Sequence, residues 1–504
     1  MKLLSLNPNN HDSNMCYFDG TILHYFKSER FEQIKHHFVK SKFSYEDYLK
    51  SIFNVTLKDI DEICFVCFYE KNKNSLPTEW RNIKNSSLLD HHLAHSLSLK
   101  LLYDIPSDVS IVVDGLGGDN SWVVYKNDIV VDRGDFNSCG SIGHGMEHMG
   151  RILGITGMKL DVAGKLMGLQ SYGKIDYNFL EILKQYNEYN IGNYFEFEKG
   201  IAIPLDATKG LFSFHEYQKY KNYNDNEINN SMLDWATTVH HRCGEIILDL
   251  FNKHAKPDTV IDYSGGVAQN VIWNTLLKKH FKNLNVQPHC SDEGLSLGGI
   301  EYLRLKHNLP KMQLANFPYS QTDEAPKMII EEDTIKKAAT FLSEGKIVAW
   351  YQGHGEVGPR ALGNRSILMD PRIRGGRDII NKIKNREYYR PFGASVLSEF
   401  KKEYFDLDFE NPYMLYVGVT QKPNLEAITH VDGTCRAQTV SKPGHFKSLL
   451  EEFYKITGCP VLLNTSLNIS GKPIAGHIQN AIDEFNNSNI DVLVVGNQIY
   501  QKTN

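Results

Sequence analysis

Two histidines and two aspartates have the types and spacing of a metal-binding site. His91 and His95 lie four residues apart, and a helix places residues at this spacing on one face. Zinc enzymes of the His-Glu-x-x-His type bind metal in this way, but here His92 replaces the glutamate that acts as their base. Asp114 follows an apolar, β-branched run, and Asp292 stands at another strand-to-helix junction. The alternatives are a helix face with histidines at its solvent edge and, for Asp292, a helix N-cap.

Glycines beside these acids could bring bare backbone close to a phosphate. One group directly follows Asp114, and a second follows a later strand and precedes Asn270. A strand–Gly–Gly–helix junction lets a nucleotide lie against the backbone, although many α/β turns carry glycine pairs for packing alone. The glycines are Gly115, Gly117, Gly118, Gly265 and Gly266.

Six of the basic residues that cluster within thirty-one positions of the C-terminal half could bind an anion, and they lie among Gly and Pro residues that force turns. Guanidinium groups bind phosphate and carboxyl oxygens bidentately, and lysine adds a point charge. A solvated basic helix face would not explain the turns, so we expect an anion-binding pocket. A later apolar strand ends in Asn464, Thr465 and Ser466, which could complete this pocket or serve as caps. These six residues are Arg360, Arg365, Arg372, Lys384, Arg386 and Arg390.

Composition excludes some classes of protein. The chain has 504 residues, enough for two or more domains, with 41% hydrophobic and 23% charged residues. Its formal charge of −5 gives no overall field for nucleic acid or membrane, although a local basic groove stays open. No apolar run reaches the roughly 20 residues that span a bilayer, and the start lacks a signal-peptide pattern. We therefore expect a cytoplasmic protein.

Cysteine usage also indicates a reducing compartment. Of eight cysteines, only Cys64 and Cys67 form a C-x-x-C pair. They lie in an apolar run that predicts a buried strand, where cysteine behaves as a small hydrophobe rather than a redox or zinc ligand. We expect the thiols to be reduced.

The order of predicted elements indicates an α/β protein with a duplicated half-domain. Strands at 3–6, 15–18 and 21–26, the last two joined by an Asp-Gly turn, are followed by a second strand–loop–strand–turn–strand series at 111–131. An amphipathic helix is predicted within 229–256. The polar segment 308–333 predicts a linker to a second domain.

Several stretches together resemble the O-carbamoyltransferase family, typified by the nodulation protein NodU and the cephalosporin and tobramycin carbamoyltransferases. The resemblance covers nearly the whole chain and is most specific in the C-terminal half. The stretches are 28–31 with 34–36, 91–95, the Asp114 loop, 264–270, 358–368, 386–392 and 461–468.

The resemblance implies a fold and a two-step reaction. Residues 1–320 would form an actin/sugar-kinase-like (ASKHA) domain similar to TsaD, and residues 321–504 a YrdC-like domain. The second domain would convert carbamoyl phosphate and ATP to carbamoyl-adenylate with release of pyrophosphate. The first would transfer the carbamoyl group to an acceptor hydroxyl, with Fe²⁺ bound; the ligand types leave Mn²⁺, Zn²⁺ and Mg²⁺ open.

The resemblance also assigns roles to residues. His91, His95, Asp114 and Asp292 match the metal ligands. His11, with Asp12, matches a histidine proposed to act near the acceptor hydroxyl. The positions matching the carbamoyl-phosphate and adenylate pocket are Arg360, Lys384, Arg390 and Ser466. The remaining positions assigned to cofactor binding are Gly115, Gly117, Gly118, Lys165, Gly265, Gly266, Asn270, Arg365, Arg386, Asn464 and Thr465.

Departures from the family pattern concern the acceptor. Asn10 stands where the family has a glycine, and the segments 142–148 and 175–224 look individual. We expect acceptor specificity to reside in those segments, so the acceptor itself is not carried over. A homodimer is expected from the family, and no membrane partner is expected.

Four functions remain to be distinguished. The favoured one is O-carbamoylation of a small molecule, sugar or nucleoside. A variant would modify a hydroxymethylated nucleic-acid base or a tRNA, and would bind in a salt-dependent manner. A non-catalytic ATP-dependent switch would bind ATP without releasing pyrophosphate, and a sugar kinase would release ADP.

Overall fold

Two five-stranded sheets with the same strand plan organise the first 300 residues. In the first, three antiparallel strands run in the order β3-β2-β1, and β4 then joins β1 in parallel, followed by β5. The predicted Asp-Gly hairpin connects β2 and β3, and the Asp19 side chain accepts hydrogen bonds from the Thr21 and Ile22 amides, both at 2.7 Å. The strands are β1 (Leu3–Leu6), β2 (Asn14–Phe18), β3 (Leu23–Lys27), β4 (Glu62–Cys67) and β5 (Ser86–Asp90).

The second sheet repeats this plan. Its order, β12-β11-β6-β7-β8, has the antiparallel meander at one side and parallel strands at the other. The α/β class and the predicted duplication, the plan of actin-like ATPases, are confirmed. The strands are β6 (Val109–Gly117), β7 (Asn120–Lys126), β8 (Ile129–Asp135), β11 (Ile261–Ser264) and β12 (Leu284–Val286).

One detail differs from expectation. The strand predicted to end at Val113 continues after a register shift, and Gly117 still pairs with Asn120. Asp114 therefore lies inside a strand, at an irregularity, rather than beyond the end of one.

The computed structural model describes residues 1–8, 11–39, 42–67, 78–81, 83–101, 106–191, 195–198, 201–204, 210–221, 228–327, 329–469 and 471–502. By packing, the chain divides into unit 1 (Met1–Val66, Pro77–Ser87 and Asp292–Asn504) and unit 2 (Cys67–Leu76 and Leu88–Ser291). Unit 1 thus joins the first sheet with the C-terminal half. The predicted domain boundary between residues 320 and 321 stays a prediction.

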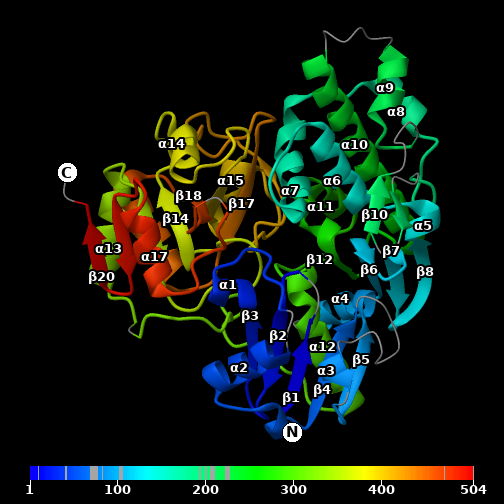
Figure 1. The fold of residues 1–504 in the computed structure, drawn as a ribbon. Coiled ribbons are helices and arrows are strands. Elements are labelled where there is room, and N and C mark those ends of the chain that lie inside the picture. The colour runs from blue at the N-terminus through cyan, green and yellow to red at the C-terminus, as the bar shows by residue number, and fades with distance from the viewer. Residues whose placement is uncertain are drawn as a thin grey trace. The chain divides into compact units, whose positions relative to one another are not determined.

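Helices surround both sheets (Figure 1). In unit 1 the sheet packs against α12, whose contacts are with β1 and β2. The helices of unit 1 in this region are α1 (Ser28–Glu32), α2 (Lys42–Phe53), η1 (Leu57–Asp59), α3 (Thr78–Arg81), η6 (Asp292–Gly294) and α12 (Leu295–Lys306).

Unit 2 contains the long helix α10, which confirms the amphipathic helix predicted within 229–256. It also contains the strand pair β9 (Phe195–Glu198) and β10 (Ile201–Pro204). Its helices are α4 (His91–Lys100), α5 (Phe136–Cys139), α6 (Ile142–Ile152), α7 (Lys159–Leu169), η3 (Gln170–Tyr172), α8 (Tyr177–Leu183), α9 (Phe214–Lys221), α10 (Ile228–His254), η5 (Gly266–Gln269) and α11 (Val271–His280).

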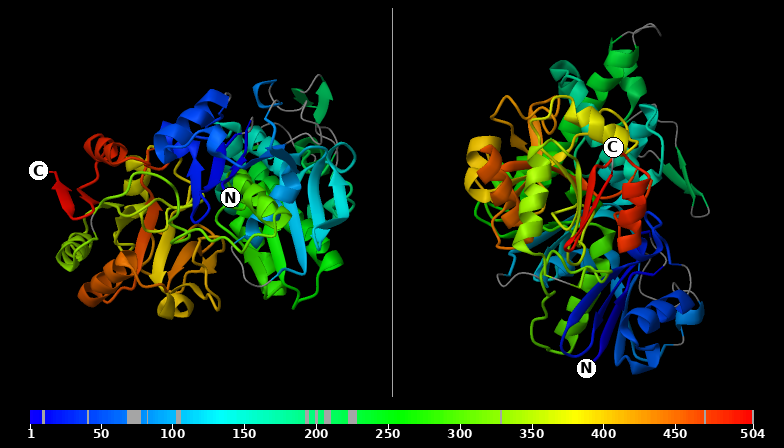
Figure 2. Two further views of the ribbon diagram at one scale, coloured as in Figure 1. Left: turned by 90° about the horizontal axis from the view of Figure 1, so that it is seen from below. Right: turned by 90° about the vertical axis from the view of Figure 1, so that its left-hand side faces the viewer.

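The C-terminal half of unit 1 is built on an eight-stranded mixed sheet, in the order β16-β17-β15-β18-β14-β13-β19-β20. Figure 2 shows α13 and α16 on one side of this sheet and α17 on the other. Its YrdC-like nature stays a prediction. The elements are α13 (Glu332–Ser343), β13 (Val348–Tyr351), β14 (Arg365–Met369), α14 (Gly376–Ile383), β15 (Gly393–Leu397), η7 (Ser398–Phe400), α15 (Lys401–Phe405), β16 (Gly418–Val419), β17 (Thr434–Val440), α16 (His445–Thr457), β18 (Val461–Ser466), α17 (Ile478–Asn486), β19 (Val492–Val495) and β20 (Gln498–Gln501).

Between α12 and α13 the described backbone forms only isolated bridges, Leu23 with Leu314 and Tyr25 with Gln321, as expected for a linker. All eight cysteines are free and buried, and Cys64 and Cys67 lie in β4. Among the described residues, no helix is long and apolar enough to cross a membrane.

Gly265 offers a test of how closely β11 approaches β6. It adopts φ +95°, and a Cβ added there would lie 2.1 Å from the Val113 carbonyl oxygen. Gly154, in the same unit, has φ +76° with nothing within 4 Å of an added Cβ. We expect Gly154→Ala to lower the free energy of unfolding by about 1–2 kcal/mol through backbone strain alone. Gly265→Ala should cost a further 1–3 kcal/mol, roughly, from overpacking. Urea denaturation of both variants measures the difference, and equal losses would contradict the close approach.

Candidate metal centre and anion pocket

The two helical histidines of the metal prediction lie together on α4. The helix begins at His91, and its N-cap residue Asp90 accepts a hydrogen bond from the Leu93 amide at 2.9 Å. The spacing of four residues places the His91 and His95 rings with their centroids 4.8 Å apart. Both side chains are buried, so they do not form the solvent edge of a helix face.

Asp114 of β6 completes a group of three potential metal ligands in unit 2. Its Oδ2 lies 2.9 Å from Nε2 of His91 and 3.5 Å from Nε2 of His95. The two imidazole nitrogens are 3.2 Å from each other. Ligand atoms about 2.1 Å from a common ion are separated by roughly 3 Å, so this geometry fits a divalent metal with nitrogen and oxygen preference.

Backbone amides hold the second oxygen of Asp114. Its Oδ1 accepts hydrogen bonds from the amides of Gly115 at 2.8 Å and Gly266 at 2.9 Å. Burial raises the pKa of Asp114, but the hydrogen bonds from His91 and His95 outweigh it and hold this pKa well below its usual range. The carboxylate is thus kept charged and fixed, as a metal ligand requires.

The sequence predicts that the glycines of this region contact phosphate. In the structure they have steric and conformational roles. A Cβ on Gly117 would lie 2.4 Å from the His92 ring and 2.6 Å from the His91 ring. Gly118 adopts φ +65° in the turn that follows. Gly117 therefore lets the strand pass close to the histidines. Contact between the glycines and a nucleotide stays a prediction.

Asp292 belongs to unit 1, so its role as fourth ligand stays a prediction. It is buried at the start of η6, while Gly294 is the N-cap of α12, so the N-cap alternative for Asp292 is wrong. Its backbone oxygen accepts a hydrogen bond from the Asn14 side chain at 2.9 Å. Its Oδ2 lies 3.5 Å from Nε2 of His11. The predicted catalytic histidine and the predicted ligand are thus neighbours within one unit.

Asn10 lies outside the described residues, as does part of the individual segment 175–224.

The remaining predicted nucleotide residues of unit 2 occupy helix ends and surfaces. Asn270 is the N-cap of α11, where its side chain accepts from the Ile272 and Trp273 amides, and its Nδ2 donates to Nε2 of the buried His240 at 3.0 Å. Lys165 of α7 donates to the Thr156 carbonyl at 2.8 Å. These contacts explain the residues without a nucleotide, and their cofactor roles stay predictions.

In unit 1, the predicted anion pocket brings basic side chains together near the start of β15. The Lys384 ammonium donates to Oγ of Ser466 at 3.2 Å and to Oδ1 of Asn468 at 2.9 Å. Burial, followed by repulsion from Arg386 and Arg390, holds the pKa of Lys384 well below its usual range. A bound anion would therefore offset the repulsion that acts on the Lys384 ammonium.

Arg436 is a further member of this group that the sequence pattern does not reveal. The sheet register places Gly393 opposite Arg436 on one side and opposite Asn464 on the other. Burial and repulsion from Arg360 and Arg390 lower the pKa of Arg436. Nε of Arg436 and Oδ1 of Asn464 are buried without a hydrogen-bond partner among the described residues. The only sequence signal was a single arginine in an otherwise uncharged strand.

Other members of the arginine-rich segment are held by the protein itself. The fully buried Arg365 donates to the carbonyls of Gln352, Gly353 and Glu324, and its guanidinium stacks 3.6 Å from the centre of the Tyr351 ring. Arg372 forms an ion pair with Asp370 at 2.6 Å. Arg365 can therefore affect ligand binding only indirectly, by supporting the loop whose carbonyls it binds.

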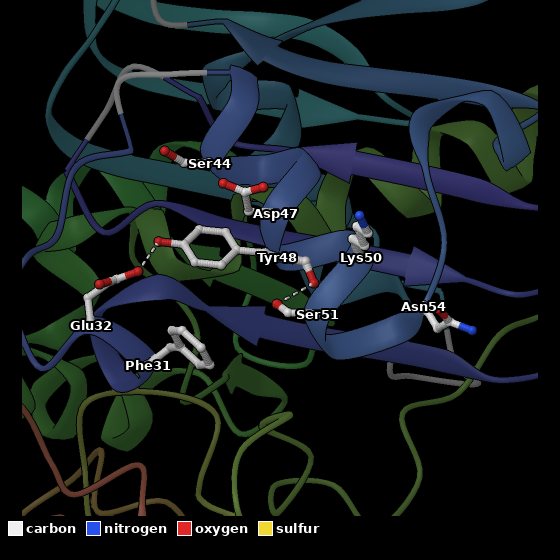
Figure 3. Close-up of a pocket in the computed structure, with 8 residues that line it drawn as sticks. All are labelled: Phe31, Glu32, Ser44, Asp47, Tyr48, Lys50, Ser51 and Asn54. Carbon is white, nitrogen blue, oxygen red and sulfur yellow. Dashed lines mark hydrogen bonds between the residues drawn. The ribbon is translucent and has the colours of Figure 1, made fainter.

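Two of the surface hollows formed by described residues lie in unit 1. One of about 560 Å³ lies between α1 and α2 and is lined by Phe31, Glu32 and Tyr48 among others, with the Tyr48 hydroxyl donating to Glu32 at 2.6 Å (Figure 3). No predicted site residue lines it. The other, of about 340 Å³, is lined partly by Arg386 and Asn381 on α14 and the turn after it.

Comparison with known proteins adds to this geometry. The model of the carbamoyltransferase N-terminus matches residues 72–300, and that of the carbamoyltransferase C-terminus matches residues 339–502. The nodulation protein NolO of Bradyrhizobium diazoefficiens is 30% identical over 446 residues, which cover 82% of this chain and 79% of NolO. The chain belongs to the carbamoyltransferase family.

Other relatives extend the comparison. The 3'-hydroxymethylcephem-O-carbamoyltransferase of Amycolatopsis lactamdurans is 32% identical over 365 residues, 68% of this chain and 66% of that protein. The nodulation protein NolNO of Sinorhizobium fredii is 34% identical over 298 residues, 53% of this chain but only 44% of NolNO.

The structural likenesses are more distant. Component A of the Acidaminococcus fermentans (R)-2-hydroxyglutaryl-CoA dehydratase has a TM-score of 0.37 and 15% identity, with 60% of this chain and 97% of that chain covered. HypF of T. kodakarensis has a TM-score of 0.34 and 13% identity, with coverages of 62% and 48%.

Replacing the α4 histidines tests the metal centre. We expect His91→Ala and His95→Ala to lower the affinity for a divalent ion by more than the roughly 10–100-fold that loss of an outer-shell partner costs. The half-exposed His241, which lies beside Glu245, provides the control variant His241→Ala. Metal content per chain after gel filtration, measured by emission spectrometry, reads out the effect. Retention of a full metal equivalent in both α4 variants would show that the cluster binds no metal.

Proposed function

We propose that this carbamoyltransferase is ATP-dependent and acts on an acceptor hydroxyl in two steps. In the first, carbamoyl phosphate and ATP give carbamoyl-adenylate. In the second, the acceptor oxygen displaces AMP from the carbamoyl carbon. The acceptor class is a small molecule, sugar or nucleoside, in keeping with a net charge of −5.

The observation that carries the proposal is the crowding of cations around β15. Burial and repulsion from Arg360 and Arg390 lower the pKa of Arg436, and burial and repulsion from Arg390 likewise lower the pKa of the neighbouring Arg386. Arginine does not lose its proton in proteins, so this repulsion is relieved by binding an anion. A phosphate-rich substrate supplies the required negative charge.

The first step consumes one water molecule. Water releases phosphate from carbamoyl phosphate and leaves carbamate. A carbamate oxygen attacks the α-phosphorus of ATP, and pyrophosphate leaves. The basic side chains neutralise the charge that moves onto the departing oxygens, while Ser466 and the polar atoms of Asn464 are placed to orient the carbamoyl group.

Transfer to the acceptor is assigned to the region of His11. Its imidazole is suited to accept the proton of an attacking alcohol near neutral pH. A divalent metal held by His91, His95 and Asp114, with Asp292 as the predicted fourth ligand, would supply Lewis-acid polarisation of oxygen atoms. Arg30, from the helix that follows β3, donates to the Gly358 carbonyl at 2.9 Å, two residues before Arg360. This contact supports a short path for an intermediate that water destroys readily.

The first test follows pyrophosphate release from ATP with purified protein and no acceptor. We expect release only when carbamoyl phosphate is present, together with one phosphate per pyrophosphate. ADP as the product would favour the sugar kinase, and ATP binding without turnover by metal-loaded protein would favour the switch.

Arg390→Ala tests the pocket itself. Removing this guanidinium should lower the rate of carbamoyl-phosphate-dependent pyrophosphate release by at least about 100-fold, as for other groups that stabilise transition-state charge. Arg374, an exposed arginine of the same half, gives the matched control Arg374→Ala, which should retain the wild-type rate. Normal release by the Arg390 variant would refute its role.

His11→Asn separates the two steps. We expect pyrophosphate release to persist while transfer of labelled carbamoyl to an acceptor falls by roughly 10²–10⁴-fold. The acceptor is found first by offering the wild type hydroxylated small molecules, sugars, nucleosides and hydroxymethylated DNA. If both steps fall equally, His11 is a structural residue.

A further inference from the structure

A buried lysine beside the predicted catalytic histidine has no role in the reaction described above. Lys27 ends β3, and its side chain is only 5% exposed. Its ammonium lies 3.0 Å from Oδ1 of Asp12, 3.2 Å from Oε1 of Glu29 and 2.8 Å from Oε2 of Glu293. Three carboxylates from separate segments of unit 1 thus meet at one cation.

This arrangement fixes the charge of Asp12. A buried carboxylate without a partner is strongly destabilised in its charged form and normally takes up a proton instead. Burial raises the pKa of Asp12, but attraction to Lys27 and hydrogen bonds from His11 and His36 outweigh it, and this pKa lies well below its usual range. The second oxygen of Asp12 is therefore available as an acceptor.

Two histidines use that second oxygen. Nδ1 of His11 and Nδ1 of His36 each lie 2.9 Å from Oδ2 of Asp12. Asp12 and His36 both adopt left-handed backbone conformations, with φ +58° and +52°. Such strain persists only where surrounding contacts impose it. Here the Asn14 side chain donates to the Asp12 carbonyl at 2.7 Å, and the His36 amide donates to Glu29 at 2.9 Å.

The same three side chains could hold a metal ion, since His11, Asp12 and His36 offer two nitrogens and an oxygen close together. The position of Lys27 argues against it. Its ammonium is 3.0 Å from the carboxylate that would bind the ion, and the two positive charges would repel each other across one carboxyl group. A hydrogen-bonded network, in contrast, gains from this ammonium.

We propose that Lys27 and His36 are positioning residues for the transfer step. Lys27 and His36 hold the Asp12 carboxylate, and Asp12 in turn holds the proton of His11 on Nδ1. Nε2 of His11 lies 3.5 Å from Oδ2 of Asp292, and the acceptor hydroxyl would bind beside these two side chains. The inference rests on the proposed function for the role of His11, but the network itself is tested separately.

The test reads the tautomer of His11 by ¹⁵N–¹H correlation spectra of full-length protein labelled on histidine. The chain has 20 histidines, so His11→Asn identifies the signal. In the wild type we expect the neutral tautomer with the proton on Nδ1. Lys27→Met should shift His11 toward the Nε2-protonated tautomer or to a mixture, and Lys27→Arg, which keeps the charge, should restore it. Lys58→Met, at an exposed lysine, is the control.

A second pair of variants covers the case in which Lys27→Met does not fold. His36→Phe removes the donor to Asp12, whereas His36→Gln retains one, so only the first should change the His11 signal. All folded variants should release pyrophosphate as the wild type does.

Two results would overturn the inference. One is a His11 spectrum unchanged in both Lys27→Met and His36→Phe. The other is a second equivalent of metal per chain that disappears in His36→Phe, which would assign the three side chains to an ion. Absence of carbamoyl-phosphate-dependent pyrophosphate release in the wild type would refute the proposed function instead, and leave the tautomer result standing on its own.

Discussion

Mutual repulsion among buried cations is the constraint on which the C-terminal half depends. Folding places Arg436 and Asn464 on the two sides of Gly393, and brings Lys384, Arg386 and Arg390 close enough to repel one another. Gathering these charges has an electrostatic cost, which the fold offsets with a core that includes the fully buried strands β13 and β15. A site kept at such a cost is suited to a substrate that carries several negative charges.

The metal centre and the His11 network show the complementary arrangement, in which carboxylates are the groups held in place. Asp114 receives two backbone amides on one oxygen and faces two imidazoles with the other. Asp12 receives an ammonium on one oxygen and two imidazoles on the other. In both, one oxygen is anchored by groups that take no part in chemistry, and the other is aimed at histidines. Anchoring of this kind reduces the reorganisation needed during reaction.

Local sequence patterns were enough to predict features that lie within one helix or within two strands joined by a tight turn. The spacing of His91 and His95 specified one helical face, and the Asp19–Gly20 turn specified the β2–β3 hairpin. Groupings that depend on sheet register or on distant segments could not be predicted. Arg436 joins the pocket only because β17 pairs with β15, and one of the three carboxylates around Lys27 belongs to Glu293, which is 266 residues away. The glycines assigned to phosphate contact likewise showed their steric role only once the histidines beside Gly117 were placed.

The central claim is that this protein activates a carbamoyl group as an adenylate. The most direct measurement is exchange of labelled pyrophosphate into ATP by the purified, metal-loaded protein without any acceptor. The account predicts exchange that requires carbamoyl phosphate and that is lost in Arg390→Ala but retained in His11→Asn. Exchange independent of carbamoyl phosphate, or formation of ADP with no exchange, would contradict it.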